Sequence, residues 1–172
     1  SERTEHEVLD RTEFNDIPFL QNLQSKALKQ LGSSGSGNHF VEFGKVEITD
    51  ATNPMGLAVG NYVGLLSHSG SRGLGANIAN HYTQIAMQKT VLPKEAKHLA
   101  WLDLNTEAGM EYWLAMNLAG DYASACHHTI HAKIAKAIGE KPLARVDNHH
   151  NFACKEMYQG NEVIVHRKGA TP

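Results

Sequence analysis

The sequence predicts an α+β fold in which helices flank mixed or antiparallel sheets. Three observations support this: stretches of helical hydrophobic spacing, shorter stretches of strand character, and loops rich in Gly, Ser and Asn at the strand ends. At 172 residues the chain is long enough for one domain with a substantial core and too short for two. We therefore expect residues 1–172 to form a single domain, and a partial one.

Three helices are predicted from the spacing of apolar residues. They cover residues 13–31, residues 74 to about 89, and a long amphipathic stretch at roughly 106–138 that forms one helix or two in line. The core side of the long helix is predicted to carry Trp113, Leu114, Leu118, Tyr122, Ile130 and Ile134.

Four strands are predicted between and after these helices. The first runs from about residue 38 to 48, after a Gly/Ser loop at residues 32–37, and the second is a buried strand over 61–67. Two short strands are expected at 143–147 and 162–166. Each strand runs into a segment with residues suited to binding, so strand ends are where a site is expected.

Composition and charge limit the class of protein. Hydrophobic residues make up 41% and charged residues 20% of the chain, which is ordinary for a soluble globular protein. The net charge of −2 supplies no general attraction for polyanions, so nucleic-acid binding requires a local basic patch. The isolated cysteines Cys126 and Cys154, the polar N-terminus and the absence of long apolar runs predict a cytoplasmic protein without a membrane span.

Both ends of the sequence are abrupt. The chain begins without Met and stops directly after a predicted strand and a basic loop. We therefore expect it to be part of a longer protein.

Three histidines, His39, His68 and His150, each lie where a predicted strand meets a Gly-, Ser- or Asn-rich loop. Imidazole is the commonest protein ligand for divalent first-row metals, so convergence of these strand ends would build a metal site. The alternative for each histidine alone is a hydrogen-bonded loop residue. Since His149 and His150 alternate along the chain, only one of them is expected to face the metal.

Strand alternation raises a difficulty for this site. In a regular strand His39 and Glu42 lie on opposite faces, so both serve one site only if a bulge or the start of the strand reorients His39.

Two segments combine a loop with basic residues. Arg72 lies in Ser69-Gly70-Ser71-Arg72-Gly73, a predicted strand–loop–helix junction whose amides and helix dipole favour an anion. A tight turn that needs glycines is the alternative. Arg167 and Lys168 follow the last predicted strand, where a solvated strand end is the alternative to phosphate binding.

A second metal motif competes with the first. His127 and His131 are four residues apart on the long helix and could chelate zinc. The hydrolytic form of this motif requires Glu directly after the first histidine, and His128 occupies that position. A polar or partly buried helix face is the favoured interpretation.

Four segments in order and spacing resemble the RtcB family of RNA-splicing ligases, nearly over the whole chain. They are Leu31-Gly-Ser-Ser-Gly-Ser-Gly-Asn-His-Phe-Val-Glu42, His68-Ser-Gly-Ser-Arg-Gly73, Asn148-His-His-Asn151 and His166-Arg-Lys-Gly-Ala170. The resemblance implies a GTP- and Mn²⁺-dependent enzyme that joins an RNA 3′-phosphate or 2′,3′-cyclic phosphate to a 5′-hydroxyl.

The resemblance also implies roles for individual residues. His39, His68 and His150 match ligands of the family's two-metal centre. The same comparison implies guanylate contacts for Asn38, Glu42 and Asn151, and RNA or nucleotide phosphate contacts for Arg72, Arg167 and Lys168.

The sequence departs from the family at three places. It contains neither a His-Gly-Ala-Gly-Arg-like segment with the guanylylated histidine nor the Asp-x-x-Cys segment whose thiolate bridges the metals, and Cys126 stands where the family often has Asn. We expect the intact parent protein to be an RNA ligase and this chain alone to be inactive. The alternatives are a non-catalytic, truncated paralogue that binds metal or nucleotide, and a metal-dependent phosphohydrolase.

Overall fold

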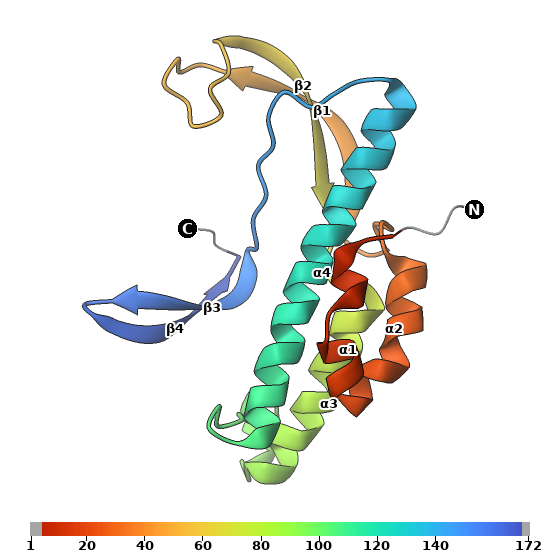
Figure 1. Ribbon diagram of the computed structural model, residues 1–172. Helices are drawn as coiled ribbons and strands as arrows, with labels where there is room; N and C mark the ends of the chain where they lie inside the picture. Colours follow the sequence, from red (N-terminus) through yellow and green to blue (C-terminus); the bar gives the residue numbers. More distant parts are fainter. Residues whose placement is uncertain (1–4, 170–172) are drawn as a thin grey trace.

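A computed structural model describes residues 5–169, which form a helical body and two separate β-hairpins (Figure 1). The elements in chain order are η1 (Glu7–Asp10), α1 (Glu13–Asp16), α2 (Pro18–Gln30), β1 (Phe40–Ile48), β2 (Gly60–His68), α3 (Arg72–Lys89), η2 (Lys94–Leu99), α4 (Glu107–Ile138), β3 (Asn151–Tyr158) and β4 (Asn161–Lys168). The predicted α+β class is confirmed.

The long helix α4 is the axis of the molecule. Its 32 residues extend about 48 Å at 1.5 Å per residue, and it runs past the helical body toward the β1–β2 hairpin (Figure 1). Thr106 caps its N-terminus by accepting a hydrogen bond from the Gly109 amide at 3.2 Å, and Gly139 ends it in the left-handed conformation at φ 76°. Of the two alternatives left open by the sequence, one helix or two in line, the structure shows one continuous helix.

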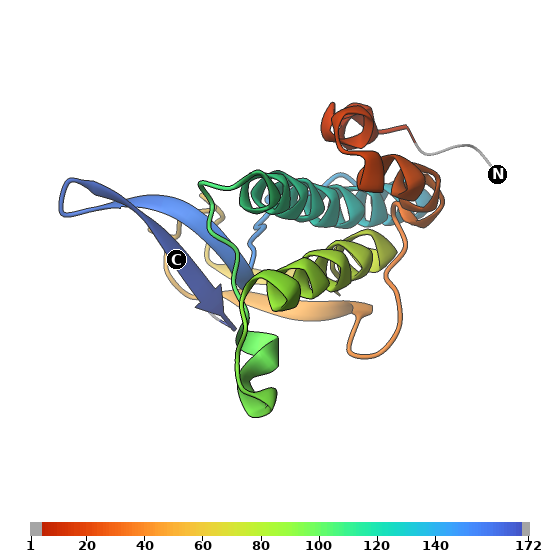
Figure 2. The same cartoon turned by 90° about the horizontal axis from the view of Figure 1, so that it is seen from below.

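In the described residues, the main hydrophobic core lies among the helices and the residues that flank them. Side chains of η1, α1, α2, α3 and α4 interlock, and the largest fully buried ones are Tyr82, Tyr122, Phe14, Leu20, Leu74, Leu118 and Cys126. Figure 2 shows α3 and α4 side by side, with α1 and α2 on the opposite side of α4 from the β3–β4 hairpin. The core face of α4 carries many alanines, and the predicted core residue Leu114 is 47% exposed instead.

Both sheets are two-stranded and antiparallel. In the first, β1 pairs with β2 so that Phe40 lies opposite His68, and in the second, β3 pairs with β4 so that Asn151 lies opposite Lys168. Gln159 and Gly160, both at positive φ, form the two-residue turn between β3 and β4. Neither pair of strands belongs to the helical core in the described residues.

Three predictions about elements are wrong. The helix predicted over 13–31 is interrupted at Ile17, because Pro18 lacks an amide proton and starts a new helix at its first position. The strand over 61–67 is present but not buried, since Val63 is 81% exposed. The strand predicted over 143–147 does not form: these residues are extended without a partner strand, and the pairing strand β3 begins only at Asn151.

Among residues 5–169, no helix is both long and apolar enough to cross a lipid bilayer.

Replacing Tyr122 by Phe tests the anchorage of α4 in the core. The buried Tyr122 hydroxyl donates to the Ala27 carbonyl of α2 at 2.6 Å, and its loss leaves that carbonyl without this partner. We expect a loss of about 1–3 kcal/mol in the free energy of unfolding, measured by urea denaturation. Tyr62→Phe is the control, because the Tyr62 hydroxyl donates to the Ala58 carbonyl at 2.8 Å in an exposed position. Equal losses in the two variants would contradict the expected role of burial.

Candidate metal centre

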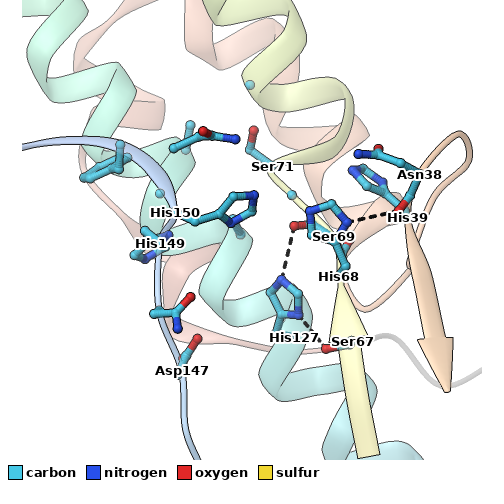
Figure 3. Close-up of a pocket in the computed structure, with 18 of the residues that line it drawn as sticks. Asn38, His39, Ser67, His68, Ser69, Ser71, His127, Asp147, His149 and His150 are labelled. Carbon is cyan, nitrogen blue, oxygen red and sulfur yellow. Dashed lines mark hydrogen bonds between the residues drawn. The ribbon is translucent and has the colours of Figure 1, made fainter. Parts of the chain in front are cut away.

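One cavity of about 850 Å³ contains all three predicted metal ligands (Figure 3). Its walls come from the start of β1, the β2–α3 junction, one face of α3 and α4, and the segment from Arg145 to Phe152. The lining combines polar residues, the histidines among them, with apolar side chains that include Ile78, Tyr112 and Met116.

His68 lies between the other two histidines. Its ring centroid is 5.7 Å from that of His39 and 5.2 Å from that of His150. Two imidazoles bound to one divalent ion, each with its nitrogen about 2.1 Å from the metal, have ring centroids roughly 5 Å apart. Both neighbouring pairs therefore have the spacing of a shared metal ligand set, although the three residues come from distant parts of the chain.

The hydrogen bonding of His68 favours a metal at its Nε2 atom. Nδ1 lies 3.0 Å from the carbonyl oxygen of Asn38, which can only accept, so Nδ1 carries the proton and donates. In a neutral ring this leaves the lone pair on Nε2. A backbone carbonyl that fixes the tautomer of a histidine is the usual support of a metal ligand.

His39 precedes the first residue of β1, Phe40, so the alternation of faces along the strand does not apply to it. Among the described residues, its Nδ1 is the buried side-chain nitrogen or oxygen that lacks a hydrogen-bond partner. A buried polar atom without a partner is costly, so an unpaired ring nitrogen at this place is what a missing ligand would leave.

His150, not His149, faces His68. The ring of His149 instead lies over Phe152, with centroids 5.2 Å apart and 30° between the planes. Phe152 in turn packs on Gly120 of α4, where an added Cβ would lie 2.7 Å from the phenyl ring. This close contact holds the start of β3 against α4. Both histidines line the cavity, and His150 is the one whose ring lies beside His68.

The donor atoms of the three histidines suit a divalent first-row metal in kind, but the three side chains are not gathered around one point. Within residues 5–169, no three His, Cys, Asp or Glu side chains are placed closely enough to hold a metal ion together. Cys126 cannot supply a thiolate, because it is fully buried in the helical core and burial raises the pKa of its thiol. The three histidines thus fit part of a metal centre, and further ligands are required.

The Gly/Ser loop at residues 32–37 is tied to the β2–α3 junction. Ser69 Oγ donates to the Ser34 carbonyl at 2.7 Å, and Arg72 Nε donates to Ser33 Oγ at 3.2 Å. Arg72 itself adopts a left-handed conformation at φ 55°, unusual for a residue with a side chain. These contacts hold the segment before His39 against the segment after His68.

The predicted nucleotide and phosphate ligands divide into two groups. Asn38 and Asn151 line the cavity, and the Asn151 side-chain oxygen accepts a hydrogen bond from the Gly169 amide at 2.7 Å. The cavity lining among the described residues does not include the other four, Glu42, Arg72, Arg167 and Lys168.

Two of those basic residues, Arg72 and Arg167, already form hydrogen bonds or ion pairs within the protein. Arg167 forms a two-pronged ion pair with Glu156 across the β3–β4 hairpin, and Arg72 bonds to the Gly/Ser loop. The side chain of Gln30 accepts from the Gly73 amide at 2.9 Å, so one of the α3 amides expected to bind an anion is already bonded. Phosphate binding by these residues stays a prediction.

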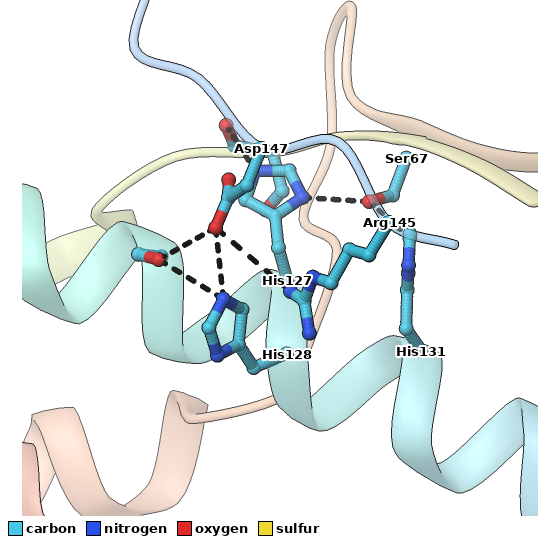
Figure 4. Close-up of polar contacts among 8 residues, drawn as sticks. Ser67, His127, His128, His131, Arg145 and Asp147 are labelled. Atoms are coloured by element: carbon cyan, nitrogen blue, oxygen red, sulfur yellow. Dashed lines mark hydrogen bonds and ion pairs between the residues drawn. The ribbon is translucent and has the colours of Figure 1, made fainter. Parts of the chain in front are cut away.

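A polar cluster lies where α4 meets the cavity, and sequence reasoning missed the partners of its histidines, Ser67 and Asp147 (Figure 4). His127 and His131 both point to Ser67, at 2.6 and 2.8 Å, and burial lowers the pKa of both imidazoles. His128 contacts Asp147 at 2.8 Å. This arrangement agrees with a polar, partly buried helix face, and the four-residue spacing of His127 and His131 was its signal in the sequence.

Replacing Gly35 by Ala tests whether the Gly/Ser loop supports the histidines. The new Cβ would lie 2.0 Å from Arg72 Nη1 and 2.5 Å from His39 Nδ1, so both side chains must move. Gly37→Ala is a matched control: it also has positive φ, +79° against +107°, but nothing lies within 4 Å. Both variants should lose about 1–2 kcal/mol from backbone strain, measured by urea denaturation.

The collision should appear only at Gly35, as displaced NMR signals of the His39 ring. Equal effects of the two substitutions on that ring would contradict a close packing of the loop against His39.

Comparison with known proteins identifies the family of the chain. The family model described as tRNA-splicing ligase RtcB matches residues 2–172. A tRNA-splicing ligase RtcB from Methanococcus maripaludis is 36% identical over 87% of the chain, and one from Thermococcus kodakarensis is 32% identical over 88%. An RNA-splicing ligase RtcB homolog 1 from Entamoeba dispar is 33% identical over 88%.

The match covers only part of each relative. The chain spans 35% of the two archaeal proteins and 31% of the Entamoeba protein. Since the family model covers almost every residue, including the segments of all three histidines, the chain belongs to the RtcB family of tRNA-splicing ligases.

Proposed function

We propose that a full-length protein carrying this chain is a GTP- and Mn²⁺-dependent ligase that joins RNA 3′-phosphate or 2′,3′-cyclic phosphate ends to 5′-hydroxyl ends. The observation that carries the proposal is the meeting of three histidines from three distant segments in one cavity, with His68 at ring distances of 5.7 and 5.2 Å from its neighbours. Membership of the RtcB family supports the reaction class.

His39, His68 and His150 would hold the metal in this proposal. A divalent metal at this place would neutralise charge on a phosphoryl group and polarise its oxygens. The protein residues supply position: the Asn38 carbonyl fixes the His68 tautomer, and the packing of Phe152 on Gly120 holds the start of β3, next to His150, against α4. Catalysis of this kind depends on such preorganisation more than on a reactive side chain.

The amides of Asn38 and Asn151 supply the polar contacts to nucleotide in the proposal. Both line the same cavity as the histidines, and neither carries a charge that would repel phosphate. Glu42 is exposed outside the cavity lining, so its contact with guanylate would need further parts of a full-length protein.

A phosphohydrolase is less well supported. That chemistry calls for carboxylate ligands, and Asp147 is the acidic residue in the cavity lining. Its Oδ2 is already bonded to His128 at 2.8 Å and to Ser124 at 2.9 Å.

Manganese binding by calorimetry tests the metal centre. We expect His39→Ala, His68→Ala and His150→Ala each to weaken binding by about tenfold or more, with His68→Ala the most severe because its ring neighbours both others. His149→Ala is the matched control, since its ring lies on Phe152. A loss in His149→Ala equal to that in His150→Ala, or no loss in any variant, would overturn the proposed ligand set.

An RNA joining assay tests whether this chain is active alone or needs the rest of a full-length protein. With GTP, Mn²⁺ and RNA halves bearing 2′,3′-cyclic phosphate and 5′-hydroxyl ends, the 172-residue chain should give no joined product on a denaturing gel. The full-length protein should join the halves, and His68→Ala in it should abolish the product. Joining by the chain alone would show that its three histidines form a sufficient catalytic centre.

A further inference from the structure

Ser67 connects the strand end at the metal centre to α4. Its Oγ lies 2.6 Å from His127 Nδ1 and 2.8 Å from His131 Nε2, and Ser67 directly precedes His68 in β2 (Figure 4). His127 Nε2 lies 3.2 Å from the carbonyl oxygen of Ser69, on the other side of His68. The two histidines therefore contact the residues that flank His68 before and after.

The direction of each hydrogen bond follows from one carbonyl. Because the Ser69 oxygen only accepts, His127 Nε2 must carry a proton and donate to it. In the neutral ring Nδ1 then accepts from the Ser67 hydroxyl, and Ser67 Oγ in turn accepts from a proton on His131 Nε2. The chain of donors runs from His131 through Ser67 and His127 to the Ser69 carbonyl.

The same part of α4 also binds the segment that carries His150. Asp147, three residues before His150, accepts from Ser124 Oγ at 2.9 Å and lies 2.8 Å from His128 Nε2. Arg145 approaches the same carboxylate oxygen at 3.9 Å. Residues 143–147 pair with no strand, so side-chain contacts of this kind replace the hydrogen bonds of a sheet.

We propose that the stretch of α4 from Ser124 to His131 positions His68 and His150 against each other, with His127 and His131 acting as positioning residues rather than as ligands of a second metal. This inference rests on the metal centre of the proposed function. His127 and His131 hold the strand end through Ser67 and Ser69, while Ser124 and His128 hold the opposite segment through Asp147.

The hydrogen bonds of His127 and His131 argue against a zinc site at these two residues. The nitrogens that face each other across Ser67 are both satisfied by its hydroxyl, and the remaining nitrogen of His127 is bonded to Ser69. A metal there would displace these bonds and release β2 from α4.

The test compares Ser67→Ala, which removes both imidazole bonds, with Ser67→Thr, which keeps a hydroxyl at the same position. Asp147→Ala removes the contacts of the His150 segment with Ser124 and His128 of α4. The control is His98→Ala, an exposed histidine in η2 outside the cavity lining. The readouts are Mn²⁺ affinity by calorimetry, amide hydrogen exchange by NMR, and the protonated nitrogen of each imidazole from long-range ¹H–¹⁵N spectra.

In the unsubstituted chain we expect protons on Nε2 of His127 and on Nδ1 of His68. Ser67→Ala should weaken Mn²⁺ binding about tenfold and speed amide exchange at residues 67–70, with the helical core unaffected. Ser67→Thr should restore most of the affinity, and Asp147→Ala should speed exchange at residues 147–150. His98→Ala should match the unsubstituted chain in every readout.

Three results would overturn the inference. They are unchanged affinity and exchange in Ser67→Ala, failure of Thr to restore what Ala removes, and faster exchange throughout the helices, which would indicate a role in folding alone. If the unsubstituted chain binds no Mn²⁺, the proposed metal centre fails, and the imidazole and exchange readouts still decide whether α4 positions the two histidines.

Discussion

The attachment of two hairpins to one helix is the constraint on which the site depends. Neither hairpin contributes to the main hydrophobic core, which in the described residues consists of side chains from the helices and from residues next to them, such as Ile17 and Leu31. A two-stranded sheet is marginally stable without a surface to pack on. His68 and His150 therefore meet at 5.2 Å because β2 and the segment before β3 are both bound to α4.

Two different kinds of contact make these attachments. Phe152 packs on Gly120, where the absence of a side chain lets the ring approach the helix backbone. The other contacts are polar, through Ser67, Ser69 and Asp147. Packing sets how closely the hairpin approaches, while directional hydrogen bonds set the orientation of the segments that carry the histidines. A metal centre needs both, since ligand atoms must be placed to within fractions of an ångström.

Much of this arrangement was predictable from the sequence, and the exceptions have physical reasons. The long helix follows from its apolar spacing and its caps, and the three histidines follow from their places at strand ends. Residues 143–147 have strand character but no strand to pair with, so local propensity did not decide their structure. The exposure of Val63 could not be predicted either, because an apolar residue in a strand is buried only where another surface covers it. The contact between Ser67 and His127 joins residues 60 positions apart, which no local pattern indicates.

The most direct test of the account is anomalous diffraction at the manganese absorption edge, from crystals of this chain grown with Mn²⁺. The account predicts a peak within bonding distance of one ring nitrogen from each of His39, His68 and His150. For His68 that nitrogen is Nε2. A peak between His127 and His131, or bound by Asp147 without His68, would contradict it.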